Sequence, residues 1–419
     1  MSQTSQCRVV SGSVISGAEA ALAGAGGLRD LSALFRPFCL NTLRLPNRIV
    51  MSPMGRNRSI DGIPPPTYCD YFRRRVQGGV GLCIGEAAAV GHPVASTDDM
   101  HAHFHGTAAL NSWRAIIDSV HAAGGSFMPQ IWHAGLLRGP GASGIPNPER
   151  APLGPSGWAI PLVHRLGWIN PIEVSQQLSA PMSHGDIEDV IAAFAQAAHE
   201  AKVLGADGVE IHAAHGYLID EFFWSQMNFR DDAYGGDLVS RTRFAAEVVA
   251  ECRRAVGPHF PIFLRYSQWK QQDYHVKLAQ SPGELAKFLE PLVDAGVDLF
   301  DCSTRRFWEP EFAGSDLNLA GWTKKLTGAA TMTVGSVGLN KSNWIDDESS
   351  SLSDAGLASL NPLMERLERG EFDLVAVGRM LIANPGWPNI LRGGVTAAAT
   401  DTETVPLRAY SNQILGELD

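Results

Sequence analysis

The chain has 419 residues, of which 45% are hydrophobic and 19% are charged, and its formal net charge is −10. A chain of this length buries roughly three quarters of its unfolded surface, either as two ordinary domains or as one enlarged α/β barrel. The acidic excess argues against nucleic acid as a partner, and no apolar run approaches the roughly 18 residues that a membrane span needs. We therefore expect a small-molecule partner and no membrane.

The six cysteines are widely spaced and include no C-x-x-C pair, so neither a zinc site nor a disulfide framework is indicated. This favours a reducing compartment, and we expect a cytoplasmic protein. Residues 1–30 are rich in Ser, Ala and Gly and lack the compact apolar core of a secretory signal. We predict a flexible leader there, with an organelle transit peptide as the alternative.

From about Leu31, short apolar runs alternate with segments of helical length and periodicity. Strands buried on both faces and separated by helices indicate a parallel sheet, and eight of them predict a closed (β/α)8 TIM barrel, a single α/β domain with loop insertions. The barrel is expected over residues 31–395, followed by a C-terminal tail over 396–419. The expected strands are residues 47–54, 79–87, 125–133, 208–214, 261–267, 297–304, 331–338 and 372–381.

Two helix starts are visible in the sequence. Ser281, Pro282 and Glu284 stand at the positions of a capping box that opens an amphipathic helix. Ser183 and Asp186 give a weaker version of the same signal for an earlier helix. Both patterns place helices between predicted strands, as the barrel requires.

Two long segments interrupt the alternation of strands and helices. Residues 136–182 are dense in Gly and Pro and follow the third strand, so they are expected at the catalytic face of the barrel, where they could act as a lid. Residues 340–353 are acidic and Ser-rich and predict a solvated surface loop.

Polar residues at the carboxyl ends of barrel strands are the candidates for chemistry. The fourth strand ends in His212, His215 and Tyr217. Neutral imidazoles could donate N–H groups to a carbonyl oxygen on which negative charge develops, and the phenol could then donate a proton. The alternatives are a histidine pair with a structural role and an H-x-x-H metal site, which needs a third ligand.

Other strand ends carry residues suited to a charged or heterocyclic ligand. Arg265 at the end of the fifth strand needs an anionic partner, which a neighbouring strand could also supply. Gln130 on the third strand offers a donor and an acceptor. Glycines at 335–338 and Gly378 with Arg379 follow the seventh and eighth strands, where barrels frequently bind phosphate, although simple turn geometry also explains glycines there.

Together these residues resemble the old yellow enzyme family, the FMN-dependent ene-reductases. The likeness runs over most of the barrel, from Leu34 to Pro385. The segments that carry it are NRIVMSPM at 47–54, QIWH at 130–133, GVEIHAAHGYL at 208–218, DDAYGGD at 231–237 and VGR at 377–379.

The resemblance implies a cofactor and a substrate pocket. FMN would be held by backbone groups against its ring, an amide at its pyrimidine edge, a cation at its N1/O2 side and a phosphate site. The residues implied to hold FMN are Ser52, Pro53, Met54, Gly55, Ala87, Gln130, Arg265, Val337, Gly338, Gly378 and Arg379. Asn57 and Trp132 would shape the substrate pocket, no metal is implied, and we expect a monomer or a homodimer.

The implied activity is reduction of the C=C bond of α,β-unsaturated carbonyl compounds with NADPH or NADH as reductant. His212 and His215 would hold the carbonyl oxygen, and Tyr217 would protonate the α-carbon while flavin N5 delivers hydride to the β-carbon. The alternatives are reduction of quinones or nitro compounds, a barrel dehydrogenase or demethylase, and a flavin-binding protein without turnover. Gly55 departs from the family pattern, which commonly has Thr or Cys after Pro-Met.

Overall fold

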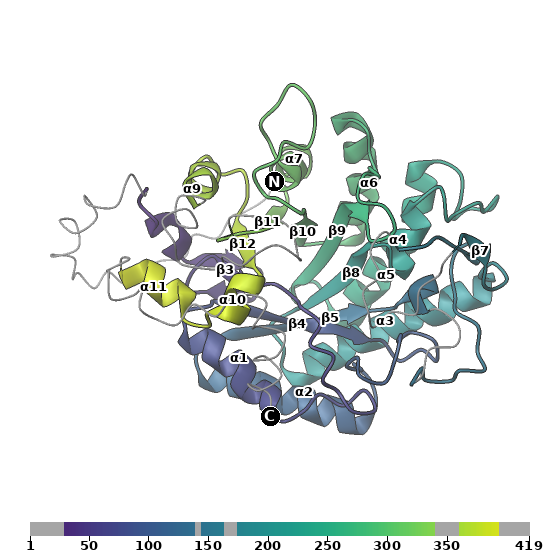
Figure 1. Ribbon diagram of the computed structural model, residues 1–419, viewed down its shortest axis with the longest axis horizontal. Coiled ribbons are helices and arrows are strands. Elements are labelled where there is room, and N and C mark those ends of the chain that lie inside the picture. The colour runs from purple at the N-terminus through teal and green to yellow at the C-terminus, as the bar shows by residue number, and fades with distance from the viewer. Residues whose placement is uncertain (1–28, 139–143, 163–173, 340–359, 394–419) are drawn as a thin grey trace.

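The computed structural model describes residues 29–138, 144–162, 174–339 and 360–393. Eight parallel strands close into a barrel in the order β10-β11-β12-β3-β4-β5-β8-β9, and helices surround it (Figure 1). The predicted TIM barrel is thereby confirmed. Its strands are β3 (Ile49–Met51), β4 (Leu82–Ala89), β5 (Ser126–Trp132), β8 (Val209–His215), β9 (Ile262–Lys270), β10 (Leu299–Ser303), β11 (Ala330–Val334) and β12 (Leu374–Val377).

The helices alternate with these strands along the chain, and each strand overlaps one predicted run. β9 continues to Lys270, past the predicted end at Ser267. The helices are η2 (Ser32–Phe35), α1 (Thr67–Gln77), α2 (Thr107–Ala122), η3 (Gly135–Arg138), α3 (His184–Leu204), α4 (Leu218–Phe223), α5 (Leu238–Val256), α6 (Pro282–Ala295), α7 (Leu319–Thr327), α9 (Leu360–Glu368), α10 (Arg379–Ala383) and α11 (Trp387–Gly393).

The barrel has an apolar interior at its amino-terminal end. A short antiparallel hairpin, β1 (Phe38–Leu40) and β2 (Leu43–Leu45), packs there against inward-facing barrel residues. The hairpin contributes Phe38, Leu43 and Leu45 to this inner cluster. Because this end is filled with apolar side chains, polar chemistry is confined to the carboxyl end of the strands.

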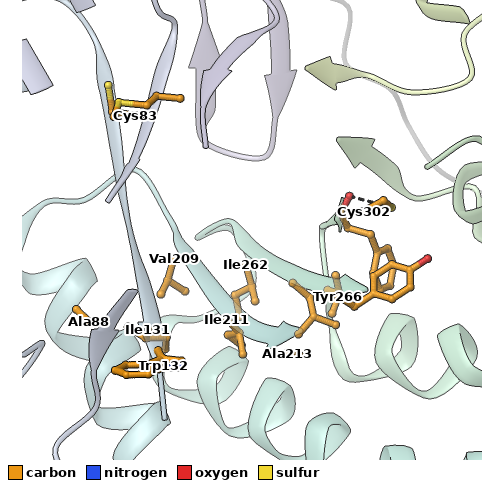
Figure 2. Packing of buried hydrophobic residues seen from close by; sticks show 14 of the residues in the cluster. Cys83, Ala88, Ile131, Trp132, Val209, Ile211, Ala213, Ile262, Tyr266 and Cys302 are labelled. Carbon is orange, nitrogen blue, oxygen red and sulfur yellow. Dashed lines mark hydrogen bonds between the residues drawn. The ribbon is translucent and has the colours of Figure 1, made fainter. Parts of the chain in front are cut away.

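A second and larger apolar layer lies between the strands and the helices. Strand residues alternate between the two faces of the sheet, so this layer includes alternate residues of β8 and β9, namely Val209, Ile211, Ala213, Ile262, Leu264 and Tyr266. Figure 2 shows Ile131, Val209, Ile211, Ile262 and Tyr266 projecting from three neighbouring strands. The layer fixes the strand register, and with it the direction of the intervening polar side chains.

The helix starts differ from expectation in one detail. At α3 the capping box is complete, since Ser183 accepts from the Asp186 amide and Asp186 accepts from the Ser183 amide. At α6 the Ser281 hydroxyl accepts from the Glu284 amide, but the Glu284 carboxylate accepts from the Gln280 amide at 2.8 Å. The extended backbone before Pro282 brings Gln280, rather than Ser281, within reach of that carboxylate.

The described part of the predicted lid packs beside the barrel mouth. It contains an antiparallel pair, β6 (Trp158–Ala159) and β7 (Gln176–Gln177). The Leu136 amide donates to Glu221 of α4 at 2.7 Å, and Arg230 donates to the Pro155 carbonyl at 2.9 Å. These contacts tie the segment to α4 and to the loop after it, both of which follow β8 in the chain, while its lid role stays a prediction. The predicted surface loop at 340–353 lies outside the described residues, as do nearly all of the leader and the C-terminal tail.

The cysteine interpretation was wrong at one position. Cys39 is disulfide-bonded. Among the described residues, Cys69, Cys83, Cys252 and Cys302 are free. Wide spacing in the sequence says little about distance in the fold, so it cannot exclude a single pair. The cysteines therefore do not indicate a reducing compartment. No helix in the described part of the chain is both long and apolar enough to cross a membrane.

The histidine at the end of the loop after β4 gives a prediction about pH. Burial lowers the pKa of His103 to about 4, whereas an unfolded histidine titrates near 6.5. Between these two pKa values the unfolded chain binds a proton on this histidine and the folded chain does not. The free energy of unfolding therefore falls as the pH drops below about 6.5. Between pH 6.5 and 5 this histidine costs about 2 kcal/mol.

His103→Gln is expected to remove that cost. In urea unfolding, the variant should lose about 2 kcal/mol less than the parent between pH 7 and pH 5. Equal losses for both proteins would show that His103 does not carry this proton linkage.

Candidate active site

The fourth barrel strand ends in the histidine pair. His212 and His215 lie near the carboxyl end of β8, with ring centroids 5.1 Å apart and planes at 88°. The chain turns sharply here, because His215 and Gly216 both have left-handed backbones, with φ of 66° and 79°. Asp220 secures the turn by accepting from the Gly216 amide at 2.7 Å.

Tyr217 lies against the first histidine. Its ring centroid is 5.0 Å from that of His212 and 5.2 Å from that of Trp132 on β5, edge to face in both cases. Burial raises the pKa of Tyr217, so the phenol keeps its proton at neutral pH. The predicted trio of two imidazoles and a phenol, with Trp132 beside it, is therefore brought together at one strand end.

Both histidines are neutral at physiological pH. Burial lowers the pKa of His212 and of His215 well below the usual value, and the positive charge of Arg265 adds to this effect. The Nδ1 atom of His212 accepts from the Ala214 amide at 3.3 Å. Since a neutral imidazole carries one proton, His212 must carry it on Nε2 and can donate it.

A buried polar network lies below the histidines. The Gln130 amide nitrogen donates to Glu210 at 2.7 Å, and Arg265 donates to the Ser52 hydroxyl at 3.2 Å. The Nε atom of Arg265 is 3.4 Å from Asp301 on the neighbouring strand. Arg265 thus has an ionic partner on a neighbouring strand. The amide nitrogen of Gln130 already donates a hydrogen bond within the barrel.

The two acids of this network were missed by the sequence reasoning. Glu210 and Asp301 are fully buried, and burial raises the pKa of each. Glu210 stands two residues before His212, and Asp301 stands two residues before Ser303. Alternation along a strand therefore places each acid on the same face as a residue at the barrel mouth, which is the signal that could have revealed them.

Free backbone donors gather after β11 and β12. The amides of Val337, Gly338 and Gly378 have no hydrogen-bond partner among the described residues. Arg379 donates to the Ser336 hydroxyl at 3.4 Å. Ser336, which precedes these amides, has a left-handed backbone with φ of 52°. Unused N–H groups beside a cation suit the oxygens of a phosphate.

The segment after β3 runs beside these donors. The Ser52 amide donates to the Val377 carbonyl at 3.0 Å. A Cβ added to Gly378 would lie 3.4 Å from the Met54 sulfur, so the two loops are in close contact. Pro53 and Met54 are half-buried and Gly55 is exposed. This partly exposed strip of backbone could contact a flat ligand.

Two further predicted residues lie at the edges of this region. Ala87 is the register partner of Gln130, just after an irregularity in β4. Asn57 has a left-handed backbone with φ of 51°, and its Oδ1 lies 3.3 Å from where a Cβ on Gly55 would stand. Within the described residues, no group of three or more metal-ligating side chains is placed to hold a metal ion.

Comparisons with known proteins agree on one family. The model of the NADH:flavin oxidoreductase / NADH oxidase family matches residues 33–397. The chain is 29% identical over 376 residues to 12-oxophytodienoate reductase 2 of Arabidopsis thaliana, which covers 85% of this chain and 87% of the relative. It is 30% identical over 359 residues to NADPH dehydrogenase of Bacillus subtilis, with 84% and 92% covered.

A solved structure of morphinone reductase in complex with tetrahydroNAD has the same fold. It aligns with a TM-score of 0.66 at 26% identity and covers 87% of this chain and 91% of its own. The fold and the matches define a barrel flavoenzyme. The chain belongs to the NADH:flavin oxidoreductase / NADH oxidase family, the old yellow enzyme family, and it is an NAD(P)H-dependent FMN oxidoreductase.

Proposed function

We propose that this enzyme reduces the C=C bond of α,β-unsaturated carbonyl compounds. The observation that carries the proposal is the trio of His212, His215 and Tyr217, two neutral imidazoles and a protonated phenol, in which the His212 ring lies about 5 Å from each of the other two rings. The name of the Arabidopsis relative, a 12-oxophytodienoate reductase, supports a reductase acting on an oxo compound.

The residues around the trio fit FMN. The free amides of Val337, Gly338 and Gly378, with Arg379, would hold the phosphate. The strip Ser52, Pro53, Met54 and Gly55, with Ala87 and Gln130, would face the ring, and the charge of Arg265 would favour an anionic reduced form. When bound, FMN supplies the hydride that reaches the β-carbon.

The protein residues then account for the rest of the chemistry. The Nε2–H group of His212, with His215 beside it, would donate to the substrate carbonyl oxygen and stabilise the negative charge that builds there. Tyr217 would transfer its phenolic proton to the α-carbon. Trp132 and Asn57 would bound the pocket and keep water from the site.

Anaerobic half-reactions test the proposal. We expect purified enzyme with bound FMN to be reduced by NADPH or NADH and then reoxidised rapidly by cyclohexenone. Comparison with a quinone and a nitroaromatic under the same conditions separates the alternatives. Rapid reoxidation by those acceptors with none by cyclohexenone would contradict ene-reduction and favour the quinone or nitro activity.

Gly55 gives a prediction about the flavin potential. Its Cβ position is 3.3 Å from the Asn57 side chain, so a serine fits after a small shift. A hydroxyl there would donate to the O4/N5 edge of the flavin and stabilise the charge gained on reduction. One such bond, about 1 kcal/mol, raises a two-electron potential by about 20 mV.

Spectroelectrochemical titration should show this rise for Gly55→Ser. Gly55→Ala is the matched control, since it adds the same Cβ without a donor and is expected to leave the potential unchanged. An equal rise in both variants would mean that the volume of the added side chain, rather than a hydrogen bond, raises the flavin potential.

A further inference from the structure

Ser303, at the carboxyl end of β10, contacts the second histidine of the site. Its hydroxyl oxygen lies 2.7 Å from Nε2 of His215. The serine is 3% exposed, and its hydroxyl has no other hydrogen-bond partner in the described part of the chain. The strand that carries it is separated from β8 by β9, so the contact passes over the end of β9.

The imidazole of His215 is held in one orientation. Its ring stacks on Trp269 with centroids 4.4 Å apart and planes at 22°. Trp269 in turn donates its indole N–H to the Ser303 carbonyl at 3.2 Å. The backbone is also fixed, because the His215 amide donates to Ser267 at 3.1 Å and its carbonyl accepts from the Gln271 side chain at 3.1 Å. With ring and backbone fixed, Nε2 faces Ser303.

The donors and acceptors around Ser303 determine whether the serine or the histidine is the donor in this contact. If Nε2 carried the proton, Ser303 would accept it, and the buried hydroxyl hydrogen would have no acceptor among the described residues. Burying an unpaired donor is unfavourable, whereas an oxygen with an unused lone pair is common. The arrangement without an unpaired donor has Ser303 donating to Nε2, which leaves the proton of the neutral ring on Nδ1.

We propose that Ser303 is a positioning residue that fixes His215 as its Nδ1–H tautomer. His212 already carries its proton on Nε2, because its Nδ1 accepts from the Ala214 amide. Each histidine then accepts a hydrogen bond from the protein at one ring nitrogen, Nδ1 in His212 and Nε2 in His215. The other ring nitrogen of each carries the proton and is available as a donor. The site thereby presents two N–H donors and no imidazole acceptor.

This inference rests on the proposed function for its consequence. Two donors favour ligand oxygens that only accept hydrogen bonds, such as carbonyl oxygens, over hydroxyl groups that must also donate. If the proton of His215 were on Nε2 instead, the unprotonated Nδ1 would face the same ligand oxygen. The lone pairs of the two atoms would then repel each other. Ser303 therefore contributes to selection of the substrate class without touching the substrate.

The direct test is the tautomer of His215 in the FMN-loaded enzyme without substrate. Long-range ¹H–¹⁵N spectra of protein labelled at histidine nitrogens separate protonated from unprotonated ring nitrogens, and the signals lost in His215→Gln identify the residue. We expect protonated Nδ1 and unprotonated Nε2. A protonated Nε2 in the parent enzyme would overturn the proposal, and this measurement does not depend on activity.

Variants test the consequence. Ser303→Ala is expected to populate the Nε2–H tautomer and to raise KM for cyclohexenone about tenfold, the loss of one hydrogen bond. Ser303→Thr keeps the hydroxyl and should restore both the spectrum and KM. Ser267→Ala is the control, because it removes a hydrogen bond to the His215 backbone amide but keeps the Ser303 hydroxyl at Nε2, and should leave the tautomer unchanged. A Ser303→Ala spectrum identical to that of the parent would count against the role.

The two proposals can fail separately. An enzyme with the expected tautomer that does not reduce cyclohexenone would refute the proposed substrate class alone. An active ene-reductase with Nε2–H on His215 would refute the role of Ser303 alone.

Discussion

Tyr217→Phe is expected to slow reoxidation of the reduced enzyme by cyclohexenone by about 10²- to 10⁴-fold, the usual range for a lost general acid. Reduction of the enzyme by NADPH should change little, because that half-reaction needs no proton from the phenol. Stopped-flow absorbance under anaerobic conditions measures each half-reaction separately.

The structure explains why the phenol suits this role. Burial raises the pKa of Tyr217, so the phenol keeps its proton through the neutral range, and in the proposed reaction it would release that proton only to a stronger base, the carbanion that develops on the substrate. The side chain is also fixed between the rings of His212 and Trp132, so little reorganisation precedes proton transfer.

Two comparisons make the test specific. Tyr234→Phe removes a phenol that donates to Glu247 at 2.8 Å, away from the histidine pair, and should leave both half-reactions unchanged. With Tyr217→Phe, a quinone should still reoxidise the enzyme at nearly the parent rate, since its oxygens take protons from water. An equal loss with cyclohexenone and the quinone would argue for a structural effect rather than acid catalysis.

Much of this site was predictable from residues close in sequence. His212, His215 and Tyr217 share one strand end, and parallel strands of a closed barrel bring their carboxyl ends together. Each run of apolar residues was long enough to predict its strand, although not its exact ends. β9 passes its predicted end because Lys270, which looks like a loop residue in the sequence, still pairs with His215 of β8.

The supporting contacts were not predictable, because they join residues that only the register of several strands brings together. Ser303 reaches His215 across an intervening strand. For Arg265 a ligand and a neighbouring strand were both expected as possible partners, but only the strand register identifies Asp301 on β10 as the residue that faces it. A serine or an aspartate in a strand gives no sign of its partner until the neighbouring strand is placed.

The buried ion pair of Lys270 and Asp220 is the clearest case of this kind. Both side chains are fully buried, and the Lys270 ammonium donates to Asp220 beneath the turn that follows His215. Burial raises the pKa of Asp220 and lowers the pKa of Lys270, while the attraction between them opposes both shifts. Lysine at a strand end is ordinarily exposed, so the sequence suggested nothing.

Lys270→Met is expected to destabilise the protein by about 3–5 kcal/mol, because it leaves the Asp220 carboxylate buried without its counter-ion. Denaturant unfolding with FMN present measures the loss. The pKa of Asp220 is higher in the folded protein than in the unfolded chain. As the pH falls, the folded variant therefore takes up a proton on Asp220 before the unfolded chain does. The deficit should therefore shrink as the pH falls through that pKa.

The double variant Asp220→Asn/Lys270→Met separates loss of charge balance from loss of packing. The asparagine oxygen can still accept from the Gly216 amide, as the carboxylate does at 2.7 Å, but no charge is left uncompensated. We expect this variant to recover much of the lost stability and to show no comparable pH dependence. A double variant as unstable as Lys270→Met at every pH would mean that the lysine stem, rather than its charge, supports the turn that carries His215.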